Sequence, residues 1–173
     1  TLVQELCKRE GAKQLISYTT RDKRPDEGET HIFTSKEEYI RMEREGNIAA
    51  FTEIDGYYCW STISQLYENN IYIIDYSGLK TLRQLNLPDI NIVSIFVNVP
   101  DEIRKERAIN QRHDKKAKFL SRNLSEKRQF EEMLKKGDFD WAISNVKFAE
   151  AYSVLHWIYN IKNGWKFKKE VLE

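Results

Sequence analysis

The stretch Ser17-Tyr18-Thr19-Thr20-Arg21-Asp22-Lys23-Arg24-Pro25 decides how this sequence is interpreted. It places two arginines three positions apart, directly after the short apolar segment Leu15-Ile16. A guanidinium presents a planar fork of donors that matches phosphate oxygens two at a time, and it stays charged at any working pH. Arg21 and Arg24, with the hydroxyls around them, therefore predict a site for a doubly charged phosphate monoester. The alternative is a solvated basic loop.

Composition limits the classes of function that are open to this chain. Its 173 residues suit one ordinary domain with room for a small inserted lobe. The 28 basic and 27 acidic residues leave a net charge of +1, so bulk attraction to nucleic acid is excluded and an anion site must be local. Cys7 and Cys59 have neither metal-ligand spacing nor a disulfide framework count. No apolar run is long enough to span a membrane, and we expect a soluble cytoplasmic protein.

The segments around the arginine loop alternate between helix and strand patterns. A short helix over 1–9 ends at Gly11, and a second helix begins with Ser35 as its cap. Strands over 48–53 and 57–61 meet at the turn signal Asp55-Gly56. Further on, we expect helices over 62–68, 79–85, 101–110, 119–136 and 148–159, and strands over 71–75, 90–97 and 141–144. The apolar strands indicate a parallel sheet covered on both faces.

Several motifs, in order, resemble the guanylate kinase family. The arginine stretch resembles the family's S-x-T-T-R-x-x-R, and Gly28-Glu29 its following G-E. Three later segments also match family motifs: Gly56-Tyr57-Tyr58-Cys59-Trp60-Ser61-Thr62 resembles G-N-Y-Y-G-S/T, Ile73-Ile74-Asp75 a strand ending in aspartate, and Phe139 to Asn145 the motif Y-D-Y-V-V-V-N. The resemblance extends to about residue 158.

The resemblance implies an α/β fold of the P-loop kinase type, with a parallel sheet flanked by helices. The core domain would comprise 1–28 and 63–173, with a helical lid at about 108–122. Residues 29–62 would form a β-rich lobe that closes over the acceptor nucleotide. The activity implied is transfer of the terminal phosphate of ATP to a nucleoside monophosphate, GMP or dGMP first, with Mg²⁺ as cofactor. Phosphoryl transfer needs mainly positioning and charge neutralisation from the protein.

Each residue role is carried over from the matching motif position. Arg21 and Arg24 would hold the acceptor phosphate, while lid arginines Arg107, Arg112 and Arg122 would close on the donor phosphates. Asn145 matches the end of the last family motif and is assigned to the ATP side. The substrate-binding set comprises Ser17, Arg21, Arg24, His31, Tyr58, Ser61 and Asp75. An ordinary exposed charge is the alternative for each lid arginine.

Several departures from the family pattern concern the acceptor base. The family's glutamate for guanine aligns with Ala50, and a second aspartate aligns with Ile73. One phosphate-binding tyrosine aligns with His31 and the other with Cys59, although Tyr58 stands beside it. Glu53 could replace the glutamate if the strand register shifts. A site that pairs with a base edge rejects analogues strongly only when those partners exist.

The chain starts at Thr1 in what matches the helix opened by the family's phosphate-binding loop. We expect a G-x-x-x-x-G-K-[ST] loop immediately upstream of Thr1; the alternative is that the protein lacks the donor site. A kinase for another phosphate monoester, and a catalytically silent module that binds a phosphorylated peptide or partner protein, remain as other functions. The predicted partners are the nucleoside monophosphate and ATP, without nucleic acid or membrane, and the chain is a monomer or homodimer.

Overall fold

The computed structural model describes residues 1–25, 27–87, 89–111 and 116–162. Its contacts divide the chain into two compact units, each built from segments far apart in sequence. Unit 1 comprises 1–6, 93–125 and 139–173, and unit 2 comprises 7–92 and 126–138. The helix α1 (Leu2–Glu10) and the helix α6 (Lys116–Lys136) each contribute to both units. The predicted lobe over 29–62 lies wholly inside unit 2, and its status as a separate domain stays a prediction.

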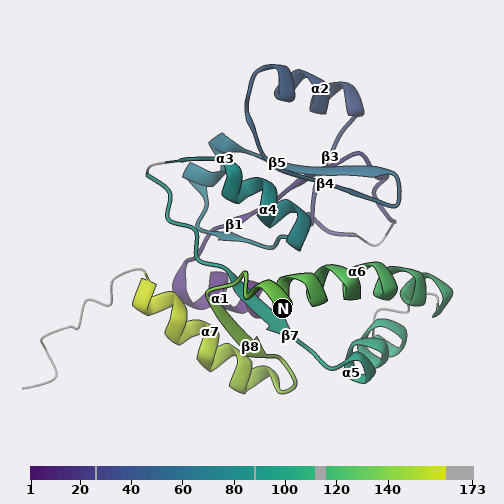
Figure 1. The fold of residues 1–173 in the computed structure, drawn as a ribbon, viewed down its shortest axis with the longest axis vertical. Helices are drawn as coiled ribbons and strands as arrows, with labels where there is room; N and C mark the ends of the chain where they lie inside the picture. Colours follow the sequence, from purple (N-terminus) through teal and green to yellow (C-terminus); the bar gives the residue numbers. More distant parts are fainter. Residues whose placement is uncertain (26, 88, 112–115, 163–173) are drawn as a thin grey trace, which may run out of the picture. The chain divides into compact units, whose positions relative to one another are not determined.

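Unit 2 is built around a four-stranded sheet with the order β3-β2-β5-β4 (Figure 1). The four strands are β2 (Tyr18–Thr19), β3 (Ile32–Phe33), β4 (Ile48–Ile54) and β5 (Tyr57–Thr62). The antiparallel pair β4–β5 turns at Asp55 and Gly56, which have φ of 53° and 80°. Two successive positive φ angles are the geometry of a tight hairpin turn, so this sequence prediction is confirmed. The strand β2, from the arginine stretch, is an inner strand of this sheet.

Aromatic packing fixes the helix α2 (Lys36–Arg44) on one face of this sheet. Tyr39 and Met42 from the helix and Trp60 from β5 form a buried cluster. The rings of Tyr18 and Trp60 stack with centroids 5.3 Å apart. Ser35 caps the helix by accepting a hydrogen bond from the Glu38 N–H, as its sequence predicts.

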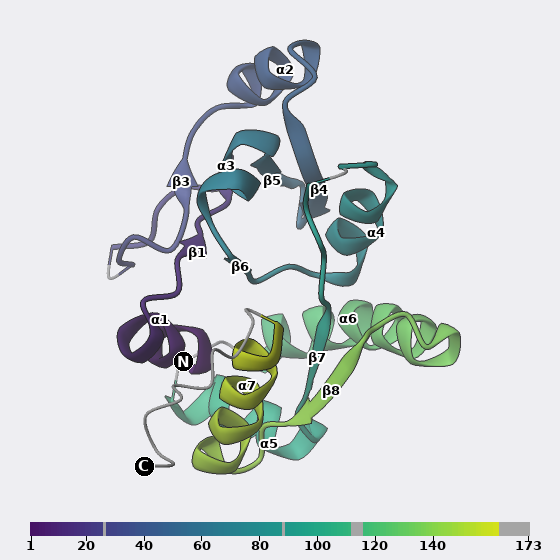
Figure 2. The same ribbon diagram turned by 90° about the vertical axis from the view of Figure 1, so that its left-hand side faces the viewer.

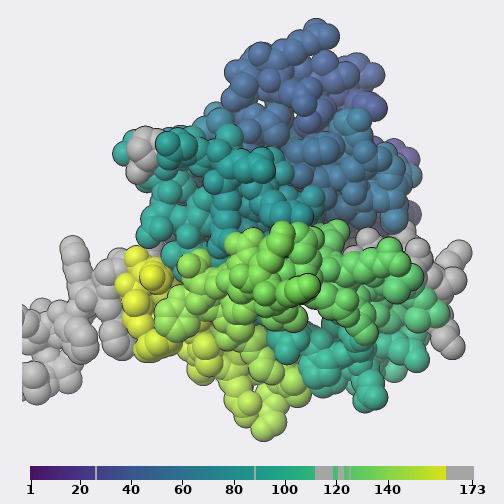
Figure 3. Space-filling model, viewed as in Figure 1, coloured from purple at the N-terminus to yellow at the C-terminus, as the bar shows by residue number. Residues whose placement is uncertain are grey.

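The opposite face of the sheet packs on the helix α4. Ala49, Ala50 and Leu82 form the buried cluster there, so α4 lies against β4. In Figure 3 the teal atoms of α4 adjoin the blue atoms of β4 and β5. The remaining elements of this part of unit 2 are β1 (Gln14–Leu15), α3 (Ile63–Glu68), β6 (Ile71–Tyr72) and α4 (Tyr76–Gln84). The strands β1 and β6 pair in parallel.

Unit 1 contains the parallel strand pair β7–β8 and the helices that accompany it (Figure 2). Its elements are β7 (Ile95–Asn98), α5 (Asp101–Glu106), the π-helix η1 (Arg107–Gln111), the first part of α6, β8 (Trp141–Ser144) and α7 (Phe148–Lys162). Asp140 ties the pair together, because its carboxylate accepts hydrogen bonds from both the N–H and the hydroxyl of Ser94.

The α/β class and the parallel pairing are confirmed, but the predicted strands are too long. Residues 71–75 give only the short β6, because Asp75 caps α4 instead of continuing the strand. Residues 90–97 give a strand only from Ile95. Asp101 is the first residue of α5 and not its cap, which is Pro100. Among the described residues, the strands form three small sheets instead of one. No helix of the described chain has the length and apolar character needed to cross a bilayer.

Candidate active site

The arginine loop leaves the sheet from β2 and is anchored to β5. The Thr20 N–H donates to the Tyr58 carbonyl at 3.0 Å, and the Tyr58 N–H donates to Thr20 Oγ1 at 2.9 Å. The Arg21 N–H donates to Thr19 Oγ1 at 3.3 Å. Ser17 lies just before β2, and its carbonyl accepts from the Ile32 N–H at 2.9 Å. The sheet therefore fixes the backbone from which Arg21 projects.

The Arg21 guanidinium is held by Glu27 in a two-pronged ion pair. Nη1 lies 2.9 Å from Glu27 Oε2 and Nη2 lies 2.7 Å from Oε1, while Nη1 also donates to the Asp22 carbonyl at 2.7 Å. The guanidinium carbon lies 5.3 Å from the centre of the Phe33 ring. A guanidinium has five N–H donors, so these contacts leave the Nε–H and one Nη2–H for a ligand. Arg21 is thus oriented in advance and keeps donors for an anion.

Glu27 organises this loop, and the sequence interpretation did not identify it. Besides Arg21, it accepts hydrogen bonds from the Thr30 hydroxyl at 2.5 Å and the Arg24 N–H at 3.3 Å. The Arg21 guanidinium, followed by these donors, holds the pKa of the Glu27 carboxyl well below its usual range. The only signal in the sequence was an acidic residue shortly after the second arginine. The motif comparison used the neighbouring Gly28-Glu29 and gave Glu27 no role.

Arg24 and His31 border the same carboxylate. The Arg24 side chain is exposed and its backbone N–H helps to close the turn onto Glu27. His31 Nδ1 lies 3.0 Å from Thr30 Oγ1 and 3.7 Å from Glu27 Oε1. Burial lowers the pKa of His31, and the positive charge of Arg21 acts in the same direction. The structure therefore brings Arg21, Arg24 and His31 together around Glu27.

Ser61, one of the predicted base-reading residues, lies on the sheet face that packs against α4. Ser61 pairs with Ala50 across β4–β5, and Cys59 pairs with both Thr52 and Thr19. Paired residues of antiparallel strands point to the same face. The Thr19 hydroxyl lies 3.4 Å from Cys59 Sγ, which agrees with this arrangement.

Asp75 has a structural role in addition to its predicted one. As the cap of α4 its side chain accepts a hydrogen bond from the Gly78 N–H at 2.8 Å through Oδ1. A carboxylate at a helix N-terminus is stabilised by the first N–H groups and by the helix dipole. Its second oxygen, Oδ2, is not used by this cap.

Glu53 and Tyr58 lie on the other face of the sheet. They pair with each other, and the face of Tyr58 also carries Trp60 and packs on α2. The idea that Glu53 replaces the glutamate aligned with Ala50 is therefore wrong in this register, because the two residues face opposite sides. Lys36 Nζ lies 4.4 Å from the Tyr58 ring centre. The structure does not bring Tyr58 together with Ser61, and the face of Ser61 carries Cys59 instead.

On the donor side, Arg107 contacts the segment of Asn145. Arg107 begins η1, and its Nη1 and Nη2 donate to the carbonyls of Asn145 and Val146, both at 2.9 Å. The Asn145 N–H donates to the Asn98 carbonyl at 2.8 Å, so β7 and Arg107 together fix this residue. Arg112 lies outside the described residues, and Arg122 lies within α6 at a position whose side chain is not described.

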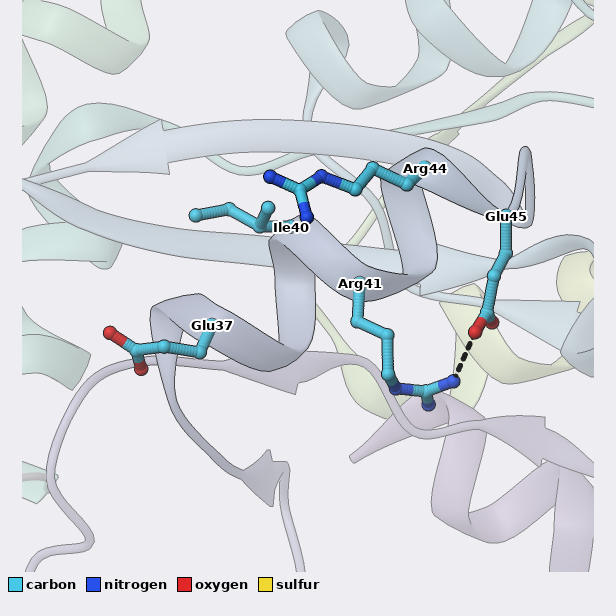
Figure 4. A pocket seen from close by; sticks show the side chains of 5 residues that line it. All are labelled: Glu37, Ile40, Arg41, Arg44 and Glu45. Carbon is cyan, nitrogen blue, oxygen red and sulfur yellow. Dashed lines mark hydrogen bonds and ion pairs between the residues drawn. The ribbon is translucent and has the colours of Figure 1, made fainter.

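A depression on α2 and the distribution of metal-binding side chains do not contribute to the proposed phosphate site. A shallow depression on α2 is lined by Glu37, Ile40, Arg41, Arg44 and Glu45 (Figure 4). Within it, Arg41 Nη1 lies 2.5 Å from Glu45 Oε1. Its lining comes from one helix and its end, so it does not bring groups from different elements together. Among the described residues, no group of three or more His, Cys, Asp and Glu side chains could hold a metal ion.

Comparisons with known proteins agree on one family. The guanylate kinase family model matches residues 1–160. The chain is 30% identical over 168 residues to the guanylate kinase of Hydrogenovibrio crunogenus, covering 92% of this chain and 80% of that protein. It is 28% identical over 147 residues to that of Vibrio parahaemolyticus, covering 80% and 69%. The crystal structure of guanylate kinase from Anaplasma phagocytophilum matches with a TM-score of 0.68 at 21% identity, covering 95% of this chain and 82% of that one.

The fold and the comparisons define a nucleoside monophosphate kinase with the P-loop kinase fold. The chain belongs to the guanylate kinase family. The family resemblance inferred from the motifs is therefore confirmed, while the roles of individual residues stay predictions.

Proposed function

We propose that this protein transfers the terminal phosphoryl group of ATP to GMP or dGMP, and that Arg21 is the main contact to the acceptor phosphate. The observation that carries the residue assignment is the pairing of Arg21 with Glu27. This ion pair fixes the guanidinium in two places and leaves two N–H donors for phosphate oxygens. Preorganised donors stabilise developing charge without reorganisation during the reaction.

The acceptor phosphate would lie between Arg21 and Arg24, with His31 as a further hydrogen-bond partner. An oxygen of the acceptor phosphate attacks the terminal phosphorus of ATP, the new P–O bond forms, and the bond to the leaving ADP oxygen breaks. The arginines neutralise charge that would otherwise keep two phosphates apart. No nucleophilic side chain is needed in this reaction.

On the donor side, we assign the adenine end of ATP to the segment around Asn145, which Arg107 holds through two carbonyls. Arg112 and Arg122 are proposed as further contacts to the donor phosphates. Mg²⁺ bound together with ATP would supply positive charge that offsets the charge of the donor phosphates.

A different monophosphate acceptor is the second candidate, and one observation favours it. On the sheet face that carries Ser61, the position aligned with the family glutamate holds Ala50, and Glu53 points to the other face. A carboxylate that would accept from the N–H groups of guanine is therefore absent at this position of β4. Asp75 is left as the predicted carboxylate of the base site.

A coupled ADP-release assay on the full-length protein tests both candidates with a panel of monophosphates. We expect turnover with GMP, and we expect Arg21→Ala to raise the KM for GMP about 10- to 150-fold, the range for one hydrogen bond to a charged group. Arg44→Ala, an exposed arginine on α2, is the matched control and should leave KM unchanged. If the protein phosphorylates only another monophosphate, that monophosphate is the acceptor instead of GMP. An unchanged KM in Arg21→Ala would reject the phosphate assignment.

A further inference from the structure

The hydroxyl of Ser61 is buried without a partner. Ser61 is 0% exposed, and among the described residues no group meets hydrogen-bond geometry with its Oγ. A buried hydroxyl without a hydrogen bond is unfavourable, so such an atom marks a place where water or a ligand completes the site. It lies on the sheet face that carries Ala50 and packs against α4.

Tyr72 is the neighbour that can act on this hydroxyl. It ends β6, where its backbone pairs with Leu15 of β1, and its ring packs against the cluster of Ala49, Ala50 and Leu82. Burial raises the pKa of Tyr72 to about 12, Asp75 and Cys59 act in the same direction, and the nearby Ser61 hydroxyl opposes them. The phenol is therefore protonated at neutral pH, and it can donate one hydrogen bond while it accepts another.

Among the described residues, Asp75 is the carboxylate that influences the Tyr72 hydroxyl. Asp75 lies close enough to influence it, and Oδ1 of Asp75 is already engaged with the Gly78 N–H. Ala50, which pairs with Ser61, adds only a methyl group to this face. Guanine presents an N1–H and a 2-amino group side by side, and both need acceptors. The carboxylate oxygen of Asp75 that the cap leaves free can accept from one of them, and a neutral group such as a phenol can accept from the other.

We propose that Tyr72 is a specificity-determining residue whose hydroxyl accepts a hydrogen bond from the 2-amino group of the purine acceptor. In the complex with the acceptor, the Tyr72 O–H would donate to Ser61 Oγ, which would give Ser61 its partner and leave the lone pairs of Tyr72 free for the ligand. The inference rests on the proposed function, because it names how that acceptor site reads its base. A neutral acceptor discriminates less than a carboxylate does, so the preference for GMP over IMP, which lacks the 2-amino group, is small.

The test compares GMP and IMP as acceptors for the full-length protein and its Tyr72→Phe variant. We expect the wild-type kcat/KM for GMP to exceed that for IMP about 2- to 10-fold, the range for one neutral hydrogen bond. Tyr72→Phe should raise the KM for GMP by the same factor, leave kcat unchanged, and leave both constants for IMP unchanged. Tyr67→Phe is the matched control, because Tyr67 on α3 is 58% exposed, and it should change neither acceptor.

Direct binding of GMP and IMP, measured by calorimetry, separates this inference from the proposed function. If the wild type binds and phosphorylates GMP but Tyr72→Phe shifts GMP and IMP equally, Tyr72 has only a packing role and the inference is rejected. An unchanged GMP affinity in Tyr72→Phe rejects it as well. If the wild type neither binds nor phosphorylates any purine monophosphate, the proposed function itself fails. Thermal unfolding of each variant shows whether it is folded.

Discussion

At the scale of single residues, the sequence indicated the anion-binding arginines but not the carboxylate that orients one of them. Arg21 and Arg24 stand out because two guanidinium groups follow a strand signal. Glu27 carries no such pattern, since its contact with Arg21 depends on how an irregular loop folds back on itself. Loop contacts of this kind follow no periodicity, so residue types and spacing do not predict them.

His31 gives a prediction about pH at the same scale. Burial and Arg21 lower its pKa from 6.5 in the folded protein, so the unfolded chain binds more protons between the folded pKa and 6.5. The free energy of unfolding should therefore rise with pH across this window. The destabilisation that results from protonating His31 in the folded protein should be fully present below the folded pKa. Urea unfolding at pH values from about 5 to about 7.5 measures this slope.

In His31→Gln the slope over this window should become smaller. His156→Gln, which changes a histidine of α7 in unit 1, is the matched control for the loss of a histidine elsewhere in the chain. Equal slopes in wild type and His31→Gln would show that another group causes the pH dependence.

At the scale of helices and strands, local signals predicted where elements end better than they predicted which strands pair with one another. The turn at Asp55-Gly56, the Ser35 cap and the helix stop at Gly137, with a φ of 62°, all depend on neighbouring residues. The pairing of β2 between β3 and β5 brings together residues far apart in the chain, and no local signal fixes it. Glu53 belongs to the β4–β5 pair, where it lies three residues after Ala50 and therefore on the opposite face.

Two substitutions of Asp75, at the N-terminus of α4, separate its structural role from its proposed binding role. Asparagine caps helices as well as aspartate does, so Asp75→Asn should change the free energy of unfolding by less than about 0.5 kcal/mol. Asp75→Ala should cost about 1 kcal/mol, because the Gly78 N–H loses its acceptor. Both variants should raise the KM for GMP, since both lack a carboxylate. Chemical denaturation and steady-state kinetics measure the two effects, and an unchanged KM in Asp75→Asn would leave Asp75 with the cap alone.

At the scale of the whole molecule, each compact unit combines segments that are far apart in the sequence. Residues 126–138 belong to unit 2, where Lys80 Nζ lies 3.6 Å from Glu132 Oε1 and Arg83 pairs with Asp138. These contacts join α4 to a segment about fifty residues further along the chain, as the separations within the pairs show. Contacts of this kind join distant segments, so no local sequence signal predicts them.

The division into two units predicts which segments of the folded chain GMP protects from amide exchange. The proposed acceptor residues, from Ser17 to Asp75, all lie in the 7–92 segment of unit 2, whereas Arg107 and Asn145 lie in unit 1. Binding stabilises the segments that it orders, so GMP alone at 100 times its Kd should slow amide exchange in β2, β5 and β6 by up to about 100-fold. Exchange in β7 and β8 should not change. Hydrogen exchange with mass spectrometry on the full-length protein measures this, with Arg21→Ala at the same GMP concentration as the control. Equal slowing in β7 and β8 would place the acceptor contacts in both units.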